Sequence, residues 1–179
     1  MKVPHNAEVI VGDYQFSDQI KSEVLSLLKV CNSIPKNHSN VKCVLHTEWN
    51  WEPNNIKFRN LKAYIREEIE KKYRPGAMSD GSRISLKCDN FWANVYEKGD
   101  YAQPHEHKPF DYSFAYFVKA KWYYPSLVFT DSGKKIRPKE GRFVAFPAYL
   151  KHHVSKHRYN DTRITLSGNL IFNRPTLNK

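Results

Sequence analysis

The sequence is poor in cysteine and has no long apolar run. Its three cysteines, Cys31, Cys43 and Cys88, are widely spaced, and no Cys-x-x-Cys pair occurs. This pattern argues against a disulfide framework and a thiolate zinc site, and it favours a reducing compartment. No stretch approaches the roughly 18 to 20 apolar residues of a membrane-spanning helix, and residues 1–10 lack the apolar core of a secretory signal. We therefore expect a soluble cytoplasmic protein with no membrane contact.

Internal repeats and low-complexity linkers are also missing, so we expect a single domain over residues 1–179. The net charge of +11 is unevenly distributed. Residues 1–80 contain 12 Lys and Arg against 10 Asp and Glu, whereas residues 81–179 contain 17 against 8. A basic field of this kind attracts anions, which include small dicarboxylates, phosphate-bearing substrates, acidic proteins and nucleic acids. Charge alone does not choose among them.

The first 80 residues have the pattern of a helical support. A first helix is expected after Ser17 as N-cap, because the apolar residues that follow fall at helical spacing. These residues are Ile20, Val24, Leu27, Leu28 and Cys31. A second helix is expected after Asn54 and Asn55, ending at Pro75. Its apolar face would contain Phe58, Leu61, Ile65 and Ile69, and its exposed i,i+4 ion pairs would be Glu67 with Lys71 and Glu68 with Lys72.

From Ile84 onward the sequence consists of short β-branched and aromatic runs separated by turn signals, which is typical of a β sandwich or barrel. The expected strands are Ile84 to Tyr96, Tyr112 to Lys119, Ser126 to Phe129, Lys135 to Pro138, Arg142 to Phe146, His153 to Lys156 and Arg163 to Phe172. Strands that follow two helices predict an α+β chain. Its sheets would form a jelly roll over residues 84–172, backed by the N-terminal helices.

Three histidines and one arginine in this β-rich part indicate chemistry. On an extended segment His105 and His107 project from the same face, so both rings can bind one metal ion. His152 follows an apolar run, and Arg163 opens a strand that is otherwise apolar and hydroxylic. A guanidinium in that place can form a bidentate pair with a carboxylate. The alternative for the His-x-His pair is two solvated loop residues.

Several segments, taken in order and spacing, resemble one family. They are residues 93–101 (ANVYEKGDY), His105-Glu106-His107, residues 112–118 (YSFAYFV), residues 146–154 (FPAYLKHHV) and Arg163-Ile164-Thr165. Together they look like the core of the Fe(II)- and 2-oxoglutarate-dependent dioxygenases, in the prolyl-hydroxylase-like branch and especially its small bacterial and phage members with a His-x-His motif. The resemblance covers residues 84–172.

The resemblance implies an oxidoreductase with a double-stranded β-helix that uses O2 and 2-oxoglutarate and releases succinate and CO2. It implies that Fe(II) is bound at the catalytic centre by His105, His107 and His152. It also implies that Arg163 binds the C5 carboxylate of 2-oxoglutarate, with help from Thr165, and that Tyr96 faces the cosubstrate. Such a chain would be a hydroxylase of an unidentified substrate.

The sequence departs from the usual family pattern at one ligand. Most of the superfamily has Asp or Glu where His107 stands, which gives a two-His, one-carboxylate site. The third ligand is therefore either His107 or a nearby carboxylate such as Asp111. We favour His107, because Glu106 would point to the opposite face. For the same reason His153 should face away from His152.

The remaining histidines receive no ligand role. His157 lies in a polar turn and is expected to be solvated, while His5, His38 and His46 have no partners in the sequence. The basic and aromatic residues 119–124 fit either a plain surface turn or a rim that contacts substrate.

Substrate and partners are less defined. A peptide or small molecule is favoured, with peptidyl proline and a free amino acid both open, and a nucleobase or other nucleic acid remains open as well. A homodimer and a virus-encoded protein acting in the host cytoplasm are further open expectations. Two rivals come from other classes: a cupin-like metal-binding dioxygenase without 2-oxoglutarate, and a non-enzymatic basic nucleic-acid-binding domain.

Overall fold

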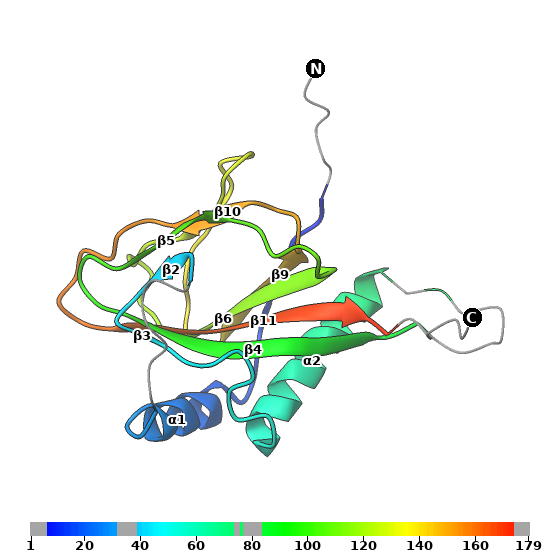
Figure 1. Ribbon diagram of the computed structural model, residues 1–179, viewed down its shortest axis with the longest axis horizontal. Coiled ribbons are helices and arrows are strands. Elements are labelled where there is room, and N and C mark those ends of the chain that lie inside the picture. Colours follow the sequence, from blue (N-terminus) through cyan, green and yellow to red (C-terminus); the bar gives the residue numbers. More distant parts are fainter. Residues whose placement is uncertain (1–6, 32–38, 74–75, 77–83, 174–179) are drawn as a thin grey trace.

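The fold has two helices and two antiparallel sheets, seen in a computed structural model that describes residues 7–31, 39–73, 76 and 84–173. The elements, in chain order, are β1 (Ile10–Asp13), α1 (Ser17–Leu27), β2 (Val41–Lys42), β3 (Leu45–His46), α2 (Ile56–Tyr73), β4 (Leu86–Tyr96), β5 (Tyr101–His105), β6 (Tyr112–Lys119), β7 (Leu127–Phe129), β8 (Lys135–Ile136), β9 (Arg142–Pro147), β10 (His152–Val154) and β11 (Arg163–Phe172). The larger sheet has the order β1-β9-β6-β11-β4-β3, and the smaller has the order β2-β5-β10-β7-β8. Figure 1 shows both helices on one face of the larger sheet and the smaller sheet on the other.

The central strand β11 explains this layering. It pairs with β4 along one edge and β6 along the other, and its residues alternate between the two faces of the sheet. Ile164, Leu166 and Leu170 belong to the core shared with the helices. The alternate positions include the buried polar residues Arg163 and Thr165. The strand therefore packs its apolar face on the helices and turns its polar face toward the smaller sheet.

The apolar face of α2 is the predicted one, with Phe58, Leu61, Ile65 and Ile69 fully buried. The start of the helix is also as predicted. The side-chain Oδ1 of Asn55 accepts hydrogen bonds from the backbone N–H of Lys57 at 3.0 Å and of Phe58 at 3.3 Å, which is the geometry of an N-cap. Pro75, the expected end, lies outside the described residues.

Two local predictions about the helices are wrong. Ser17 is the first residue of α1 and not its cap; Phe16 occupies the cap position and makes no side-chain cap hydrogen bond. The expected i,i+4 ion pairs on α2 do not form either. Lys71 pairs with Glu68 one residue closer, and Lys72 pairs with Glu8 at 2.6 Å. The segment before β1 lies along the end of α2, so it offers Lys72 a carboxylate from outside the helix.

The later strands were largely predicted, and β6 and β11 have the expected bounds. The strands β1, β2, β3 and β5 were not predicted. Two of these are only two residues long, and β5 contains Pro104, a residue that sheets admit mainly at edges. Within the part of the chain that the structure describes, no helix is long and apolar enough to cross a membrane.

Candidate metal centre

Three histidine side chains meet between β5 and β10. His105 ends β5 and His152 begins β10, and the two are cross-strand partners. His107 follows two residues after His105, and its backbone N–H donates to the carbonyl of Ala148 at 2.8 Å. One ligand atom from each of the three histidines lies within 4.8 Å of the others, and the Nε2 atoms of His107 and His152 are 3.3 Å apart. The three predicted ligands are thus brought together.

Backbone carbonyls fix the tautomer of two of these rings. The Nδ1 of His105 is 2.6 Å from the carbonyl oxygen of Gln103, and the Nδ1 of His152 is 2.9 Å from that of Leu150. A carbonyl only accepts, so each Nδ1 must carry the proton and donate. In a neutral ring this leaves the lone pair on Nε2 available. A backbone partner of this kind commonly orients a metal-binding histidine.

Burial keeps the three imidazoles neutral. Desolvation lowers the pKa of His107 to about 2 and that of His152 to about 3, with neighbouring histidines adding to the effect in both. Desolvation also lowers the pKa of His105. Neutral imidazole is the form that binds a metal ion. The group is therefore ready for a cation without first losing protons at neutral pH.

The carboxylates considered as a third ligand have other partners. Asp111 Oδ2 accepts a hydrogen bond from the backbone N–H of Phe172 at 2.8 Å, and Glu106 forms an ion pair with Lys108 at 3.1 Å. Neither belongs to the histidine group. His153 faces away from that group, as predicted, with its Nδ1 3.1 Å from the hydroxyl of Thr130.

Arg163 is a buried cation in the same sheet-lined interior. Its side chain is only 2% exposed. The guanidinium lies 4.8 Å from the ring centre of Tyr96 and 5.7 Å from that of Phe117. Its Nε and Nη1 have no hydrogen-bond partner among the described residues. Burial lowers its pKa from the usual 12.5, but an arginine remains charged near neutral pH. A buried, unsatisfied cation is costly unless an anion occupies the site.

One row of side chains on β4 connects Arg163 with the histidines. Tyr96 is the cross-strand partner of Arg163. Two residues back, the Asn94 amide donates to the Thr165 hydroxyl at 3.5 Å. Two further back, the ring of Trp92 lies 6.0 Å from that of His107. Alternate residues of a strand share one face, so this row runs along the interior from the cation to the histidine group.

Comparison with solved structures identifies the fold of this chain. No protein-family model and no curated protein sequence matches the chain. Among solved structures, the viral collagen prolyl hydroxylase of Paramecium bursaria Chlorella virus-1 matches with a TM-score of 0.68 over 90% of this chain and 94% of that one, at 16% identity. An oxidoreductase of the 2OG-Fe(II) oxygenase family from Burkholderia pseudomallei gives 0.64 over 91% and 84%, at 13% identity. The chain has the fold of the 2-oxoglutarate- and Fe(II)-dependent oxygenases.

A third match with this oxygenase fold has ligands bound. HygX from Streptomyces hygroscopicus, with nickel and 2-oxoglutarate, matches with a TM-score of 0.66 over 96% of this chain and 84% of that one, at 10% identity. The family resemblance stated from the sequence is therefore confirmed at the level of the fold. At identities this low the matches establish the fold alone.

Sequence reasoning missed one residue near the site in this oxygenase fold. His46, given no role, is 4% exposed and lies on β3 beside β4. Its ring is stacked with Trp92 at 6.1 Å and edge-on to Trp49 at 4.8 Å. Burial lowers its pKa. The only sequence signal was its position three residues before a tryptophan, which is too weak to place it.

His157 was predicted to be solvated, and this is wrong. It is 2% exposed, its Nε2 lies 2.7 Å from the carbonyl oxygen of Asp161, and its ring meets Tyr124 edge-on at 4.7 Å. Tyr124 comes from residues 119–124, the segment that fitted either a plain surface turn or a rim that contacts substrate. That segment therefore contacts the His157 turn, and its Trp122 is 72% exposed.

Proposed function

We propose that this chain is an Fe(II)- and 2-oxoglutarate-dependent dioxygenase that hydroxylates an organic substrate with release of succinate and CO2. The observation that carries the proposal is Arg163, a buried guanidinium with two N–H positions lacking a partner among the described residues. It shares one interior with a group of three neutral histidines. A five-carbon dicarboxylate has one end for the metal and one for the guanidinium, so it accounts for both features.

The residues present fit an iron ion. His105, His107 and His152 would hold it through nitrogen, and the carbonyls on two Nδ1 atoms support Nε2 as the binding atom. All three ligands are neutral, so the site keeps the full charge of the ion, and this favours a dianionic cosubstrate. When bound, iron would supply the redox chemistry that couples 2-oxoglutarate decarboxylation to hydroxylation.

The protein's part in the reaction is binding, orientation and exclusion of water. Arg163 would donate from Nε and Nη1 to the C5 carboxylate, and the rings of Tyr96 and Phe117 hold the guanidinium plane in place. Thr165, on the same face two residues on, is near enough to assist. Tyr96 is fully buried within this interior, and desolvation raises the pKa of its hydroxyl, so it remains a neutral donor.

Several finer assignments belong to the same proposal. The two facing sheets form a double-stranded β-helix, and residues 1–179 form one oxygenase domain. O2 and 2-oxoglutarate are its small-molecule partners, and a cytoplasmic location is expected. A peptide substrate is favoured, supported by neighbours named as a collagen prolyl hydroxylase and as a prolyl hydroxylase in complex with a peptide fragment of hypoxia inducible factor.

The test begins with the protein under anaerobic conditions. Adding Fe(II) and 2-oxoglutarate should give a visible charge-transfer band, because the cosubstrate binds the metal directly. We expect the band to disappear in Arg163→Ala and His152→Ala proteins that remain folded by circular dichroism. In air, the wild-type protein should form succinate from 2-oxoglutarate, and a screen of peptides and metabolites should find one that gains a single oxygen atom.

The same experiment separates the rival functions. A cupin-like dioxygenase that uses the three histidines without 2-oxoglutarate would bind Fe(II) but give neither the band nor succinate. Retention of the band in both variants would remove the assigned roles of Arg163 and His152.

A further inference from the structure

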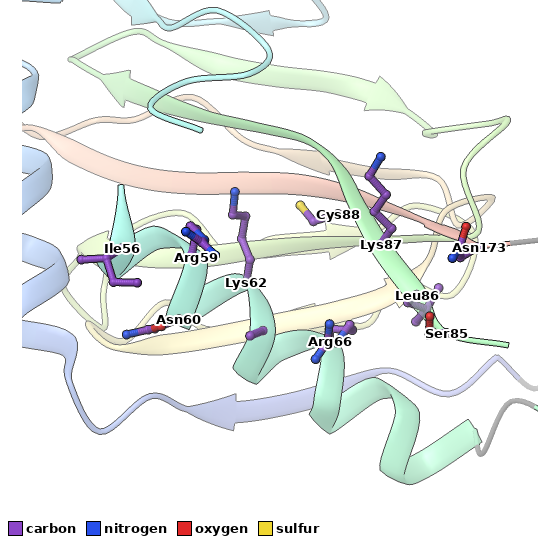
Figure 2. Close-up of a pocket in the computed structure, with 11 residues that line it drawn as sticks. Ile56, Arg59, Asn60, Lys62, Arg66, Ser85, Leu86, Lys87, Cys88 and Asn173 are labelled. Carbon is purple, nitrogen blue, oxygen red and sulfur yellow. The ribbon is translucent and has the colours of Figure 1, made fainter. Parts of the chain in front are cut away.

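A basic groove lies between α2 and the start of β4, on the sheet face that carries the helices (Figure 2). We call it the α2–β4 groove. Its volume is about 470 Å³, which is in the range of small-molecule sites. Its cationic lining comes from Arg59, Lys62 and Arg66 of α2, at the spacing that places residues on one side of a helix, and from Lys87 of β4. The histidine group belongs to the opposite side of the larger sheet.

The cations of the groove are only partly engaged by contacts within the fold. Among the described residues, neither Arg59 nor Lys62 forms an ion pair with a carboxylate, although Lys57 on the same helix pairs with Glu23. Lys62 instead holds its ammonium 5.1 Å from the ring centre of Phe91. Exposed ion pairs contribute little to stability, so pairing is not needed for folding. Its absence here leaves two positive charges available to a ligand.

Arg66 adds a third, partly committed cation. Its Nη2 pairs with the Oε1 of Glu67 at 3.5 Å. Its Nε is buried, has no hydrogen-bond partner among the described residues, and lies 3.9 Å from the Oε2 of Glu70. Glu70 is itself occupied, because its Oε1 accepts a hydrogen bond from the backbone N–H of Leu86 at 2.7 Å. A buried N–H group without an acceptor is unfavourable. A ligand oxygen in the groove would remove that cost.

The charge order along α2 also favours an anion at this place. The first turn of the helix has no acidic residue, and the helix's three glutamates, Glu67, Glu68 and Glu70, all lie in its second half. Helix N-termini carry a partial positive charge and normally attract Asp or Glu. Arg59 in the first turn therefore adds positive charge where the backbone already supplies it, and Lys62 follows about one turn later. An anion bound in the groove would offset this positive charge.

Neutral groups complete the lining. Asn60, Ser85 and Asn173 offer hydrogen-bond donors, and Figure 2 shows them around the groove with the Cys88 thiol beside Lys62. Burial raises the pKa of Cys88 to about 12, so no thiolate competes for the cations. The site thus combines a small volume, four cationic side chains, of which Arg66 is also paired with glutamates, and several neutral donors, with no acidic side chain in its lining.

We propose that the α2–β4 groove binds a phosphate-bearing anion with two or more negative charges, such as a di- or triphosphate group. Guanidinium groups bind phosphate oxygens in bidentate geometry, and four cationic side chains exceed what a single carboxylate needs. The groove is separate from the proposed oxygenase site, so the two proposals stand or fall independently. The same chemistry occurs in free polyphosphates and in a nucleic-acid backbone, and the test distinguishes these sources.

The test uses the full chain and isothermal titration with inorganic triphosphate. The groove variant is Arg59→Gln/Lys62→Gln, and the matched control is Lys134→Gln/Lys135→Gln, which removes the same charge from exposed positions at β8. We expect the wild type and the control to bind alike, and the groove variant to bind at least about tenfold more weakly, because each lost charge-assisted contact contributes roughly that factor. Thermal unfolding checks the fold, and Arg59→Gln alone serves if the double variant is unstable.

A labelled single-stranded oligonucleotide forms the second arm. Binding of triphosphate but not of the oligonucleotide would assign the groove to a free phosphate compound. Oligonucleotide binding that is weakened in the groove variant alone would assign it to a phosphodiester chain. An equal loss in the groove and control variants would show a general charge effect and overturn the proposal, as would no binding of either probe by the wild type.

Discussion

Replacing Arg163 by methionine should weaken 2-oxoglutarate binding and at the same time stabilise the ligand-free protein. The Nε and Nη1 of Arg163 have no partner among the described residues, and each charge-assisted bond to the proposed cosubstrate would contribute about 1.5 to 3 kcal/mol. Loss of both predicts a dissociation constant about 10²- to 10⁴-fold higher. Without the ligand, however, the guanidinium is a buried charge whose desolvation costs several kcal/mol.

The expected gain in stability is smaller than that cost. The rings of Tyr96 and Phe117 return part of it through cation–π contacts of about 1 to 2 kcal/mol each. A net stabilisation of about 1 to 3 kcal/mol remains, and in a chain of 179 residues this corresponds to a Tm higher by roughly 2 to 10 °C. Calorimetry in chelator without 2-oxoglutarate measures the Tm, and anaerobic titration measures binding.

The control is Arg142→Met. Arg142 is partly exposed and pairs with Asp13 at 3.2 Å, so its loss should change stability by less than about 1 kcal/mol and leave 2-oxoglutarate binding intact. If the ligand-free Arg163→Met protein were less stable than wild type, the guanidinium would already be satisfied within the fold. The argument for an anion site at Arg163 would then be refuted.

Three further predictions concern stability. Because the pKa of His152 falls from 6.5 to about 3 on folding, the metal-free unfolding free energy should fall as pH decreases from 6.5, by at most about 1.4 kcal/mol per pH unit from this group. Urea titrations at several pH values should show a weaker pH dependence of the unfolding free energy for His152→Gln. An unchanged pH dependence would contradict this role of His152. A Cβ at Gly168 would lie 2.6 Å from the Phe114 ring, so Gly168→Ala should lower the unfolding free energy by roughly 1 to 3 kcal/mol in urea unfolding. Gly76→Ala is the control, because nothing lies within 4 Å of a Cβ there, and it should have no such effect. Equal effects of the two substitutions would count against the tight packing at Gly168. Asn55→Ala should lower the unfolding free energy by about 1 kcal/mol through loss of the α2 cap. Asn55→Ser, which keeps a capping oxygen, should lower it less, and equal losses would count against the cap.

The sequence best predicted those strands and helices whose own residues strongly favour that secondary structure. β6 and β11 have the predicted bounds because they are long and rich in β-branched and aromatic residues. The face of α2 was predictable from its apolar spacing. By contrast, β5 exists because His105 pairs with β10, and nothing in its own polar sequence indicates a strand. Short strands formed by tertiary pairing leave little local signal.

In the candidate site, too, some residues were predictable from local patterns and others were not. Parity along the chain separated Glu106 from the histidine pair, and together with the spacing of the family motif it selected His152 over His153. Parity gave no information on His157, whose burial depends on Tyr124 from a distant segment. It also gave no information on His46, which is brought to Trp92 by the pairing of β3 with β4. Contacts between segments far apart in sequence were therefore the part that could not be predicted.

The position of β11 in the middle of the larger sheet ties the placement of Arg163 to folding. Sliding this strand by one residue against β4 and β6 would turn Arg163 into the apolar layer under the helices and turn the leucines toward the interior between the two sheets. A shifted strand would therefore lose both the packing of its leucines on the helices and the placement of Arg163 between the sheets. Amide hydrogens of β11 should accordingly exchange with solvent only when the whole molecule unfolds.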